Sequence, residues 1–293
     1  MKANAMVARV AAGLLAATAS ASAWADSEPV RWQLNMPEGV TRTAENAYDM
    51  HMLMLWICVA IGLVVFGAMG YSMYKFRHSK GAKPDVDFTH STKLEIIWTV
   101  VPVLILVIMA VPATARLMEQ YDTKGSDMTV KVTGYQWMWR YEIVGEDVNF
   151  ISRLDRESDR IRQSGETPTA EANPHYLRDV DRVLVLPTET KIRFVITSDD
   201  VIHAWWVPAL GWKQDAIPGV INDAWTEIRT PGTYRGVCAE LCGKDHGFMP
   251  IVVKAVPRAE YEAWLTAQKA GDLAEADRIA ATSVVPAKAG GEG

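Results

Sequence analysis

Two long stretches without a charged side chain constrain this sequence more than any other feature. The first covers residues 52–73 and the second covers residues 96–115. At about 1.5 Å per residue, a helix of this length spans roughly 30 Å, the thickness of a membrane's hydrocarbon core. Pro102 and Pro112 lie inside the second stretch, and membrane-spanning helices tolerate proline better than soluble ones. The sequence therefore predicts a transmembrane hairpin over residues 52–117.

The beginning of the chain has the layout of a cleavable export signal. Lys2 and Arg9 precede a short apolar run around residues 10–17, and an Ala-x-Ala pattern follows at positions 23–25. The apolar run is too short to span a membrane. We therefore expect residues 1–25 to be a signal peptide that is removed, and residues 26–51 to form an extracytoplasmic segment.

Basic residues predict the orientation of the hairpin. The segment before it offers only Arg31 and Arg42, whereas the connecting loop has five basic residues: Lys75, Arg77, Lys80, Lys83 and Lys93. Because cytoplasmic loops are enriched in lysine and arginine, this loop is predicted to be cytoplasmic. We expect a multi-pass protein of the bacterial inner membrane, with the N-terminus and the C-terminal domain in the periplasm.

Residues 118–257 are predicted to form an all-β domain. Residues 128–141 and 183–197 alternate between apolar and polar side chains, as half-buried strands do. Further short strands fit residues 224–229, 234–237 and 250–256, with turns at Pro218-Gly219 and Pro231-Gly232. Short strands separated by Pro-Gly turns are typical of a Greek-key sandwich or barrel.

One segment interrupts this domain and another follows it. Residues 152–178 are rich in charged residues, glycine and proline, and predict a solvated excursion with one short helix. Residues 258–293 predict an amphipathic helix over 258–268 and then a disordered tail rich in alanine and glycine.

The charge balance of the C-terminal domain excludes one class of partner. Residues 119–262 contain 23 acidic and 17 basic side chains, a difference of −6, and the whole chain has a net charge of −5. This excess argues against nucleic acid as a partner and predicts attraction of a basic one.

The chemistry is concentrated in one short segment. Cys238, Cys242, His246 and Met249 place four soft or borderline metal ligands within twelve residues. His203 lies in a second strand-like run, which a sheet could bring beside the cysteines. This density of sulfur and imidazole donors indicates a metal site.

Four interpretations compete for these donors. Cys238 and Cys242 could form a disulfide in an oxidising compartment. A tetrahedral zinc site of two cysteines and two histidines would leave Met249 unused, since thioethers suit copper better than zinc. A mononuclear blue copper site would leave one thiolate without a role. Two coppers bridged by both sulfurs, each with one terminal histidine and a weak axial ligand, use every donor, and this interpretation is favoured.

These residues resemble subunit II of the haem-copper cytochrome c oxidases over nearly the whole mature chain. That family has a two-helix anchor followed by a cupredoxin domain with a dinuclear copper A centre. The sequence blocks that carry the resemblance are Glu95-Ile-Ile-Trp98, Gly134-Tyr-Gln-Trp-Met-Trp139, Val207-Pro-Ala-Leu-Gly211, Asp215-Ala-Ile-Pro-Gly219 and the segment from Cys238 to Met249.

The resemblance implies a ligand set for two copper ions. Cys238 and Cys242 would bridge the ions, and His203 and His246 would be terminal ligands. Axial positions would be taken by Met249 on one copper and by the main-chain carbonyl of Glu240 on the other. The family also implies that the Glu240 side chain points toward a magnesium or manganese ion shared with subunit I.

The resemblance further implies electron transfer from cytochrome c through copper A to haem in subunit I. Dioxygen reduction to water and proton pumping would belong to the assembled complex. In the family, Trp137 matches the site of electron entry, and Glu95 matches the mouth of a proton pathway. We expect further oxidase subunits and membrane lipid as partners. Three acids near the metal end are candidates for docking cytochrome c: Asp199, Asp200 and Asp215.

The sequence departs from the family pattern at several positions. Met138 replaces a tyrosine, Val220 replaces an arginine, and the excursion at residues 152–178 is longer than in compact members, which affects expected partner contacts more than the metal ligands. A quinol oxidase subunit would lack the copper ligands, and a nitrous oxide reductase-type domain would lack the hairpin. A copper storage or assembly protein would need neither Trp137 nor an acidic docking face.

Overall fold

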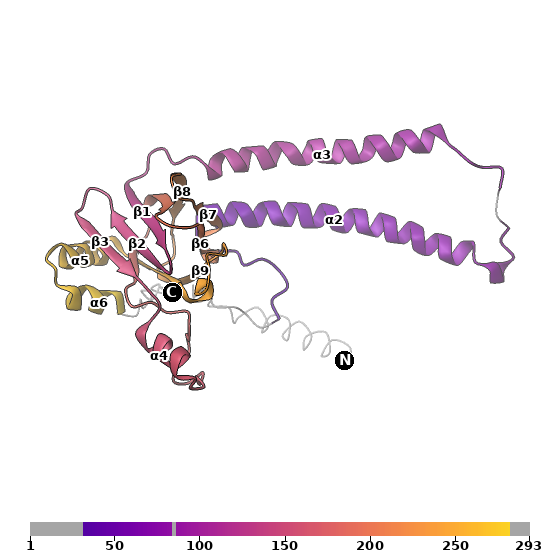
Figure 1. Cartoon of the computed structure of the whole chain (residues 1–293). Coiled ribbons are helices and arrows are strands. Elements are labelled where there is room, and N and C mark those ends of the chain that lie inside the picture. Colours follow the sequence, from indigo (N-terminus) through magenta and orange to yellow (C-terminus); the bar gives the residue numbers. More distant parts are fainter. Residues whose placement is uncertain (1–31, 84–85, 282–293) are drawn as a thin grey trace, which may run out of the picture.

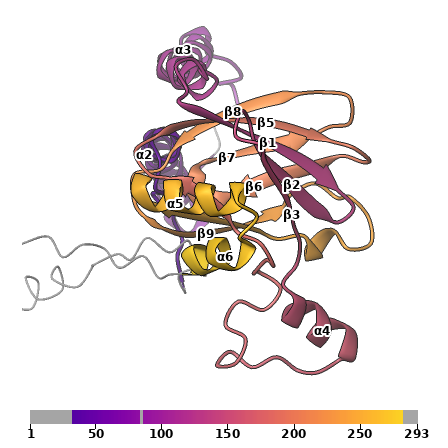
Figure 2. The same ribbon diagram turned by 90° about the vertical axis from the view of Figure 1, so that its left-hand side faces the viewer.

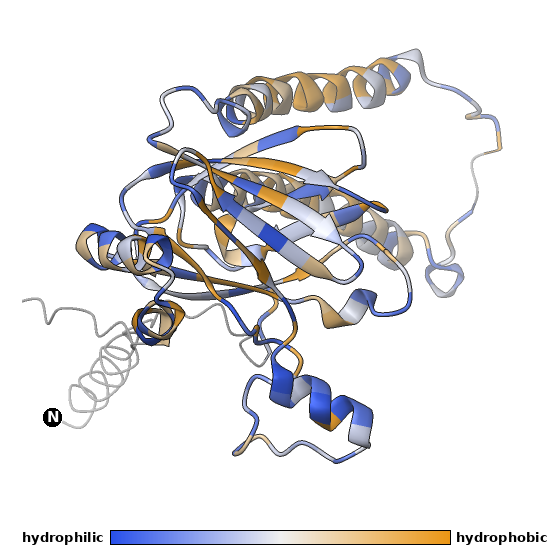
Figure 3. Ribbon diagram, turned by 60° about the vertical axis from the view of Figure 1, so that its left-hand side comes forward, coloured by the Kyte–Doolittle hydropathy of each residue, from blue (hydrophilic) through white to orange (hydrophobic). Residues whose placement is uncertain are grey.

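Two long helices extend from one end of a β-sheet domain (Figure 1). The computed structural model describes residues 32–83 and 86–281; the predicted signal peptide lies outside them. The helices are α2, Arg42–Lys75, and α3, Thr92–Gln120. Both are long and apolar enough to cross a membrane, and Figure 3 shows that most of their residues are hydrophobic. The short 3-10 helix η1, His78–Lys80, lies in the loop at the far end.

Helix α2 begins well before the uncharged stretch at Met52. Thr41 is its N-cap, and the Thr41 hydroxyl accepts a hydrogen bond from the Ala44 amide at 3.0 Å. This bond satisfies one of the amides that the first turn leaves without a helical partner. The first turn is buried at Thr43 and Ala44, so part of the expected extracytoplasmic segment is the rigid start of a helix.

The β domain is a sandwich of two five-stranded sheets (Figure 2). One has the order β3-β2-β1-β5-β8 and the other the order β4-β10-β9-β6-β7. The bounds of the strands are β1 Met128–Tyr135, β2 Met138–Ile143, β3 Val148–Ser152, β4 Leu184–Pro187, β5 Lys191–Ser198, β6 His203–Val207, β7 Trp212–Ala216, β8 Asn222–Glu227, β9 Gly232–Cys238 and β10 Ile251–Val256. The short helices η2, Pro208–Leu210, and η3, His246–Phe248, lie in connections between strands.

The predicted fold class, a two-helix anchor followed by an all-β domain, is confirmed. Strand β1 runs parallel to β5, β4 runs parallel to β10, and the other named pairs are antiparallel. The segment 128–141, predicted as one alternating stretch that runs into an aromatic patch, contains parts of two strands, because the chain turns at Gln136 and Trp137. Strands β3 and β7 were not predicted.

Aromatic side chains fill the space between the sheets. Phe194, Trp205 and Trp212 form a cluster with ring centroids 5.2 to 5.3 Å apart. Phe194 belongs to β5, where every second residue is buried, and Trp205 is fully buried on the opposite sheet. These large apolar surfaces supply much of the burial that stabilises the sandwich.

The C-terminal tail is more ordered than the sequence predicted. Helix α5, Arg258–Lys269, agrees with the predicted amphipathic helix, but residues Leu273–Ala281 form a further helix, α6. Ala276 is fully buried, and the buried Lys254 ammonium donates to the Ala280 carbonyl at 2.7 Å. The prediction of disorder was therefore wrong for α6, because small alanines let it pack closely against the domain. Residues 282–293 lie outside the described residues.

The polar excursion forms a separate lobe, residues 153–182, which contains the predicted short helix. Helix α4, Arg156–Ser164, is capped by Asp155, whose carboxylate accepts from the Ser158 amide at 3.0 Å. Figures 2 and 3 show that α4 projects from the sandwich and is strongly hydrophilic.

The start of α2 is joined to the sandwich at the turn after β6. The hydroxyls of Thr41 and Thr43 both donate to the Leu210 carbonyl, at 2.9 and 2.7 Å. Gly211 has a positive φ of +82°, and a Cβ atom there would lie 2.3 Å from Cα of Ala44. The close approach of helix and turn therefore requires glycine at this position.

Gly211→Ala is expected to lower the free energy of unfolding by about 2–4 kcal/mol, because the added methyl would collide with the backbone of α2. Gly145→Ala is the matched control, since Gly145 also has a positive φ, +86°, but faces open space. The control should lose only about 1–2 kcal/mol. Thermal unfolding of the full chain in detergent measures both, and equal losses would contradict the predicted collision.

Candidate metal centre

Strand pairing brings the upstream histidine beside the cysteine loop. His203 is the first residue of β6, and Cys238 is the last residue of β9. These strands are antiparallel neighbours with Trp205 opposite Cys238. Side chains two residues apart share one face of a strand, so His203 and Trp205 point to the same side as Cys238.

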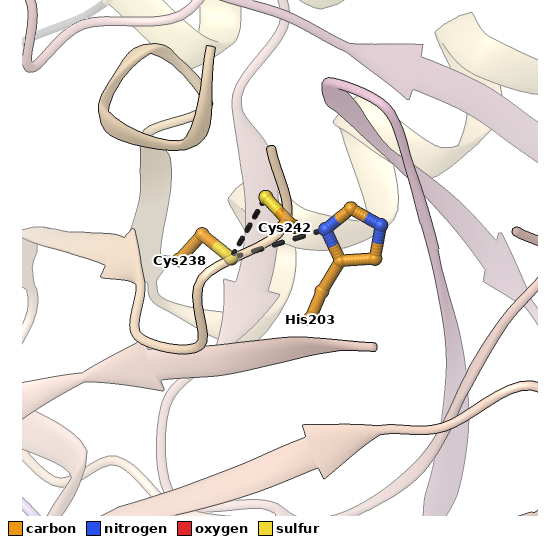
Figure 4. A group of neighbouring side chains, drawn as sticks. All are labelled: His203, Cys238 and Cys242. Carbon is orange, nitrogen blue, oxygen red and sulfur yellow. Dashed lines mark hydrogen bonds between the residues drawn. The ribbon is translucent and has the colours of Figure 1, made fainter. Parts of the chain in front are cut away.

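The sulfur and imidazole donors lie close together (Figure 4). The Cys238 Sγ atom is 3.9 Å from Nδ1 of His203 and 3.9 Å from Sγ of Cys242. All three residues are buried, and their donor atoms lie within 4.8 Å of one another. This group has the composition and compactness of a metal site.

The remaining two donors adjoin Cys242. Its Sγ atom lies 3.4 Å from Nδ1 of His246 and 3.5 Å from Sδ of Met249. His246 begins η3 and is half-buried, whereas Met249 follows η3 and is buried. Each cysteine sulfur therefore has its own histidine nitrogen as a close neighbour.

The two cysteines are not joined by a disulfide. Both are free thiols, and their separation of 3.9 Å is almost twice the bonded sulfur–sulfur distance of about 2.05 Å. It is less than twice a metal–thiolate bond of about 2.3 Å, so one ion can contact both sulfurs. The structure therefore does not contain the disulfide between Cys238 and Cys242 that one of the four interpretations required.

His203 is held from three sides. Its Nε2 atom lies 2.9 Å from Oδ1 of Asp200, and the Trp139 ring packs edge-on against the imidazole with centroids 5.8 Å apart. Gly134 packs beneath the ring, where a Cβ atom would lie only 2.8 Å from Cδ2 of His203. With Nε2 facing a carboxylate, Nδ1 remains available on the side of the sulfurs.

Burial and mutual contacts shift the pKa values of the donors in opposite directions. Burial lowers the pKa of His203, but hydrogen bonds to Cys238 and Asp200 outweigh it, so the net shift is upward. Burial raises the pKa of Cys238, but the hydrogen bond and charge of His203, together with backbone hydrogen bonds at Glu240 and Ala204, outweigh it and the net shift is downward. Burial and the neighbouring Cys238 raise the pKa of Cys242 to about 12. Two adjacent thiolates are thus unfavourable without a cation, and a bound metal would remove this conflict.

The predicted electron-entry residue contacts the cysteine loop directly. The Trp137 indole N–H donates to the Cys242 carbonyl at 3.2 Å, and the Gln136 side-chain amide donates to the same oxygen at 2.9 Å. Trp137 is half-buried and packs against the core. It therefore lies between solvent and a donor residue.

The three predicted docking acids have different surroundings. Asp199 accepts a hydrogen bond from the Tyr135 hydroxyl. Burial of Tyr135, and to a smaller extent this hydrogen bond, raises the pKa of Tyr135 to about 12. The Asp200 side chain is 31% exposed, and its carboxylate also accepts from the Gln136 amide at 2.7 Å. Asp215 lies in β7 and is half-buried. Asp200 is therefore engaged inside the site.

The two predicted glutamates lie in different parts of the molecule. Glu240 is exposed, and its main-chain carbonyl lies 3.4 Å from Sγ of Cys238. Glu95 is in the first turn of α3, where its carboxylate lies 3.3 Å from Nδ1 of His90. This end of the hairpin is the one remote from the β domain (Figure 1).

Several supporting residues were not assigned to the site from the sequence. They are Gly134, Gln136 and Trp139, together with Asp200 in its contact with His203. A signal for Asp200 was present, because it precedes His203 by three residues. The others lie about 65 residues upstream, and only the β1–β5 pairing brings their turn to the site.

Comparison with known proteins identifies the family. The family model for the periplasmic domain of cytochrome c oxidase subunit II matches residues 128–256, and the model for its transmembrane domain matches residues 29–115. A probable cytochrome c oxidase subunit 2 from Rickettsia conorii is 38% identical over 242 residues, which cover 83% of this chain and 74% of the relative. The chain belongs to the cytochrome c oxidase subunit II family.

Other similar proteins carry the same description. Cytochrome c oxidase subunit 2 of Cereibacter sphaeroides is 36% identical over 273 residues, which cover 89% of this chain and 90% of the relative. The crystal structure of the periplasmic domain of subunit II of cytochrome oxidase from Bradyrhizobium japonicum is 36% identical, covers 51% of this chain and 98% of that chain, and superposes with a TM-score of 0.44.

Membership of the cytochrome c oxidase subunit II family establishes the class of the protein. The chain is a membrane-anchored subunit of a haem-copper terminal oxidase, which is an oxidoreductase complex. Its β domain has a cupredoxin-like fold, as predicted. The family implies copper, and the donors around Cys238 form a site that fits a soft metal ion.

Asp200→Ala is expected to weaken copper retention by about 10–100-fold, because an imidazole ligand loses affinity when the partner of its second nitrogen is removed. Asp215→Ala is the control, since no hydrogen bond links the Asp215 carboxylate to a donor residue in the described part of the chain. Competition of each variant with a copper chelator measures the effect. Equal affinities in the two variants would show that Asp200 does not support His203.

Proposed function

We propose that this subunit holds a dinuclear copper A centre, accepts electrons one at a time from cytochrome c, and passes them to haem in subunit I. The observation that carries the proposal is the pairing of donors: two sulfurs lie 3.9 Å apart, His203 adjoins Cys238, and His246 adjoins Cys242. The compact donor group includes His203 but not His246. This distribution favours two metal positions over one tetrahedral ion.

In the proposed centre each donor has one role. Cys238 and Cys242 would hold both ions through their sulfurs, and His203 and His246 would each hold one ion, with Met249 as a weaker ligand. The main-chain carbonyl of Glu240, which lies 3.4 Å from Sγ of Cys238, would be a second weak ligand. The bound copper pair would supply a one-electron couple.

The protein itself fixes the positions of these donors and shields them from solvent. Cys238, Cys242, Met249 and His203 are all at most 5% exposed. Two of them are ends of neighbouring strands, and the others follow within one short loop. Ligands fixed by a sheet move little when the charge of a centre changes, which limits the rearrangement that accompanies electron transfer.

The proposed route for electrons enters through Trp137. Its indole donates to the carbonyl of Cys242, so an aromatic ring at the surface is one hydrogen bond from a bridging ligand. An electron arriving at the ring would not need to cross solvent. No bond is made or broken in this subunit; dioxygen reduction to water and proton pumping belong to the assembled complex.

The excess of acidic side chains in the β domain favours a positively charged electron-donating partner such as cytochrome c. We assign the docking charges to Asp199, Asp200 and Asp215, of which Asp199 and Asp215 are not engaged with a donor residue. Attraction between these acids and a basic partner would be screened as ionic strength rises. Asp200 has the further role of holding His203.

Contacts with subunit I are proposed at two places, one in the β domain and one in the hairpin. The exposed Glu240 side chain would face a magnesium or manganese ion shared with subunit I. Glu95 would mark the entrance of a proton pathway at the cytoplasmic end of α3. This arrangement requires the β domain to lie in the periplasm, with the hairpin loop in the cytoplasm of a bacterium.

The copper-loaded full chain is expected to bind two copper ions and to give a paramagnetic resonance signal in which one unpaired electron couples to two nuclei. Metal analysis and electron paramagnetic resonance in detergent measure this. Cys242→Ser is the control, because loss of one bridge should abolish the shared signal. One copper ion per chain, a signal from a lone nucleus, or zinc as the bound metal would contradict the proposal.

Trp137→Phe is expected to leave the metal spectrum unchanged and to slow electron entry from reduced cytochrome c by about tenfold, equivalent to about 1.4 kcal/mol in the barrier. The control is Trp206→Phe, since Trp206 is also partly exposed, at 37%, and lies on β6. Stopped-flow mixing measures both rates. Electron entry at the wild-type rate in Trp137→Phe would remove this residue from the route.

A further inference from the structure

The lobe of residues 153–182 contacts the ligand loop through Arg162. This residue of α4 forms an ion pair with Asp245, with Nη1 3.1 Å from Oδ1. Its guanidinium also lies over the ring of Phe248, 4.3 Å from the ring centroid. Asp245 directly precedes His246, and Phe248 directly precedes Met249. One guanidinium therefore contacts the neighbours of two donor residues.

The orientation of this guanidinium is fixed within the lobe. Nε and Nη2 of Arg162 donate to Oδ1 of Asp159 at 3.1 and 2.7 Å, which leaves Nη1 for Asp245. The Arg162 side chain is 25% exposed and that of Asp245 is 21% exposed. Charge-assisted hydrogen bonds to a planar, partly buried guanidinium are directional, so this contact restricts position as well as adding stability.

The two ends of the lobe are joined to each other at its base, and the Arg235 guanidinium of β9 forms an ion pair with Asp179 of the lobe at 2.9 Å. Leu154 and Val180 form an isolated antiparallel bridge. The Arg153 amide donates to the Asp181 carboxylate at 2.8 Å. Within the lobe, the buried Ile161 lies directly before Arg162 and anchors α4. Arg162 is thus held by a folded support.

The ligand loop has less support from close packing on this side. An open cleft of about 320 Å³ lies where the lobe, Trp137 and the loop meet, and Arg162, Asp245 and Phe248 are among its lining residues. Across this cleft no atoms of the described residues pack against the lining side chains, so the van der Waals contacts that normally fix a side chain are fewer there. The directional contacts of Arg162 therefore carry a larger share of the restraint on the loop.

We propose that Arg162 is a positioning residue for the metal centre. By holding Asp245 and Phe248 at the two ends of η3, it keeps His246 and Met249 in place beside Cys242. The inference rests on the proposed copper function, but the contacts of Arg162 restrain the ligand loop in the metal-free protein as well. The lobe is accordingly a support for the ligand loop.

Arg162→Ala in the full chain is expected to accelerate amide hydrogen exchange at residues 245–249 by about tenfold in the metal-free reduced protein. After copper loading, transfer of copper to a chelator should be about tenfold faster, and the copper hyperfine splitting should change. Arg160→Ala is the matched control, because Arg160 lies on the same helix and pairs only with Glu157 and Glu166 of the lobe among the described residues. Arg160→Ala should leave all three readouts unchanged.

Arg162→Lys should give an intermediate acceleration, since lysine keeps the charge but loses the planar fork. Unchanged exchange at residues 245–249 in Arg162→Ala, or the same change in Arg160→Ala, would overturn the proposal. Faster exchange across the whole lobe would also overturn it, because Arg162 would then stabilise the lobe instead of the loop. If the wild-type chain fails to bind copper, the proposed function fails, whereas the metal-free exchange result still decides the role of Arg162.

Discussion

The pairing of β6 with β9 is the constraint on which the metal centre depends. It places His203 at the start of one strand beside Cys238 at the end of its neighbour, although 35 residues separate them in the sequence. The other donors lie in the one short loop that connects β9 to β10 and contains η3. A site built in this way inherits its precision from the hydrogen bonds of a sheet, because strand ends move less than the tips of free loops.

The elements set by hydropathy were predicted well from the sequence. The two spanning helices and most strands follow from long uncharged stretches and from alternation, which are local properties. The sequence did not predict the separate strands β1 and β2, since the turn at Gln136 and Trp137 interrupts no apolar pattern. It also did not predict α6, whose stability comes from burial of Ala276 against the domain and not from its composition.

The candidate site shows the same division between local and distant information. The dense donor segment from Cys238 to Met249 was visible because the residue types themselves carry the chemistry. The support given to His203 by Gly134 and Trp139 was not visible, because it depends on the pairing of β1 with β5. Asp200 was interpreted as a surface charge, whereas its distance of 2.9 Å from Nε2 of His203 gives it a structural role.

Helix α2 continues without a flexible linker from the membrane into the β domain. The Thr41 and Thr43 hydroxyls hold its first turn to the Leu210 carbonyl, and the Trp225 indole donates to the Glu119 carbonyl near the end of α3. Two struts thus fix the position of the donor cluster relative to the spanning helices. A domain mounted in this way cannot swing as a tethered carrier does, so under the proposed function the electron donor would have to diffuse to it.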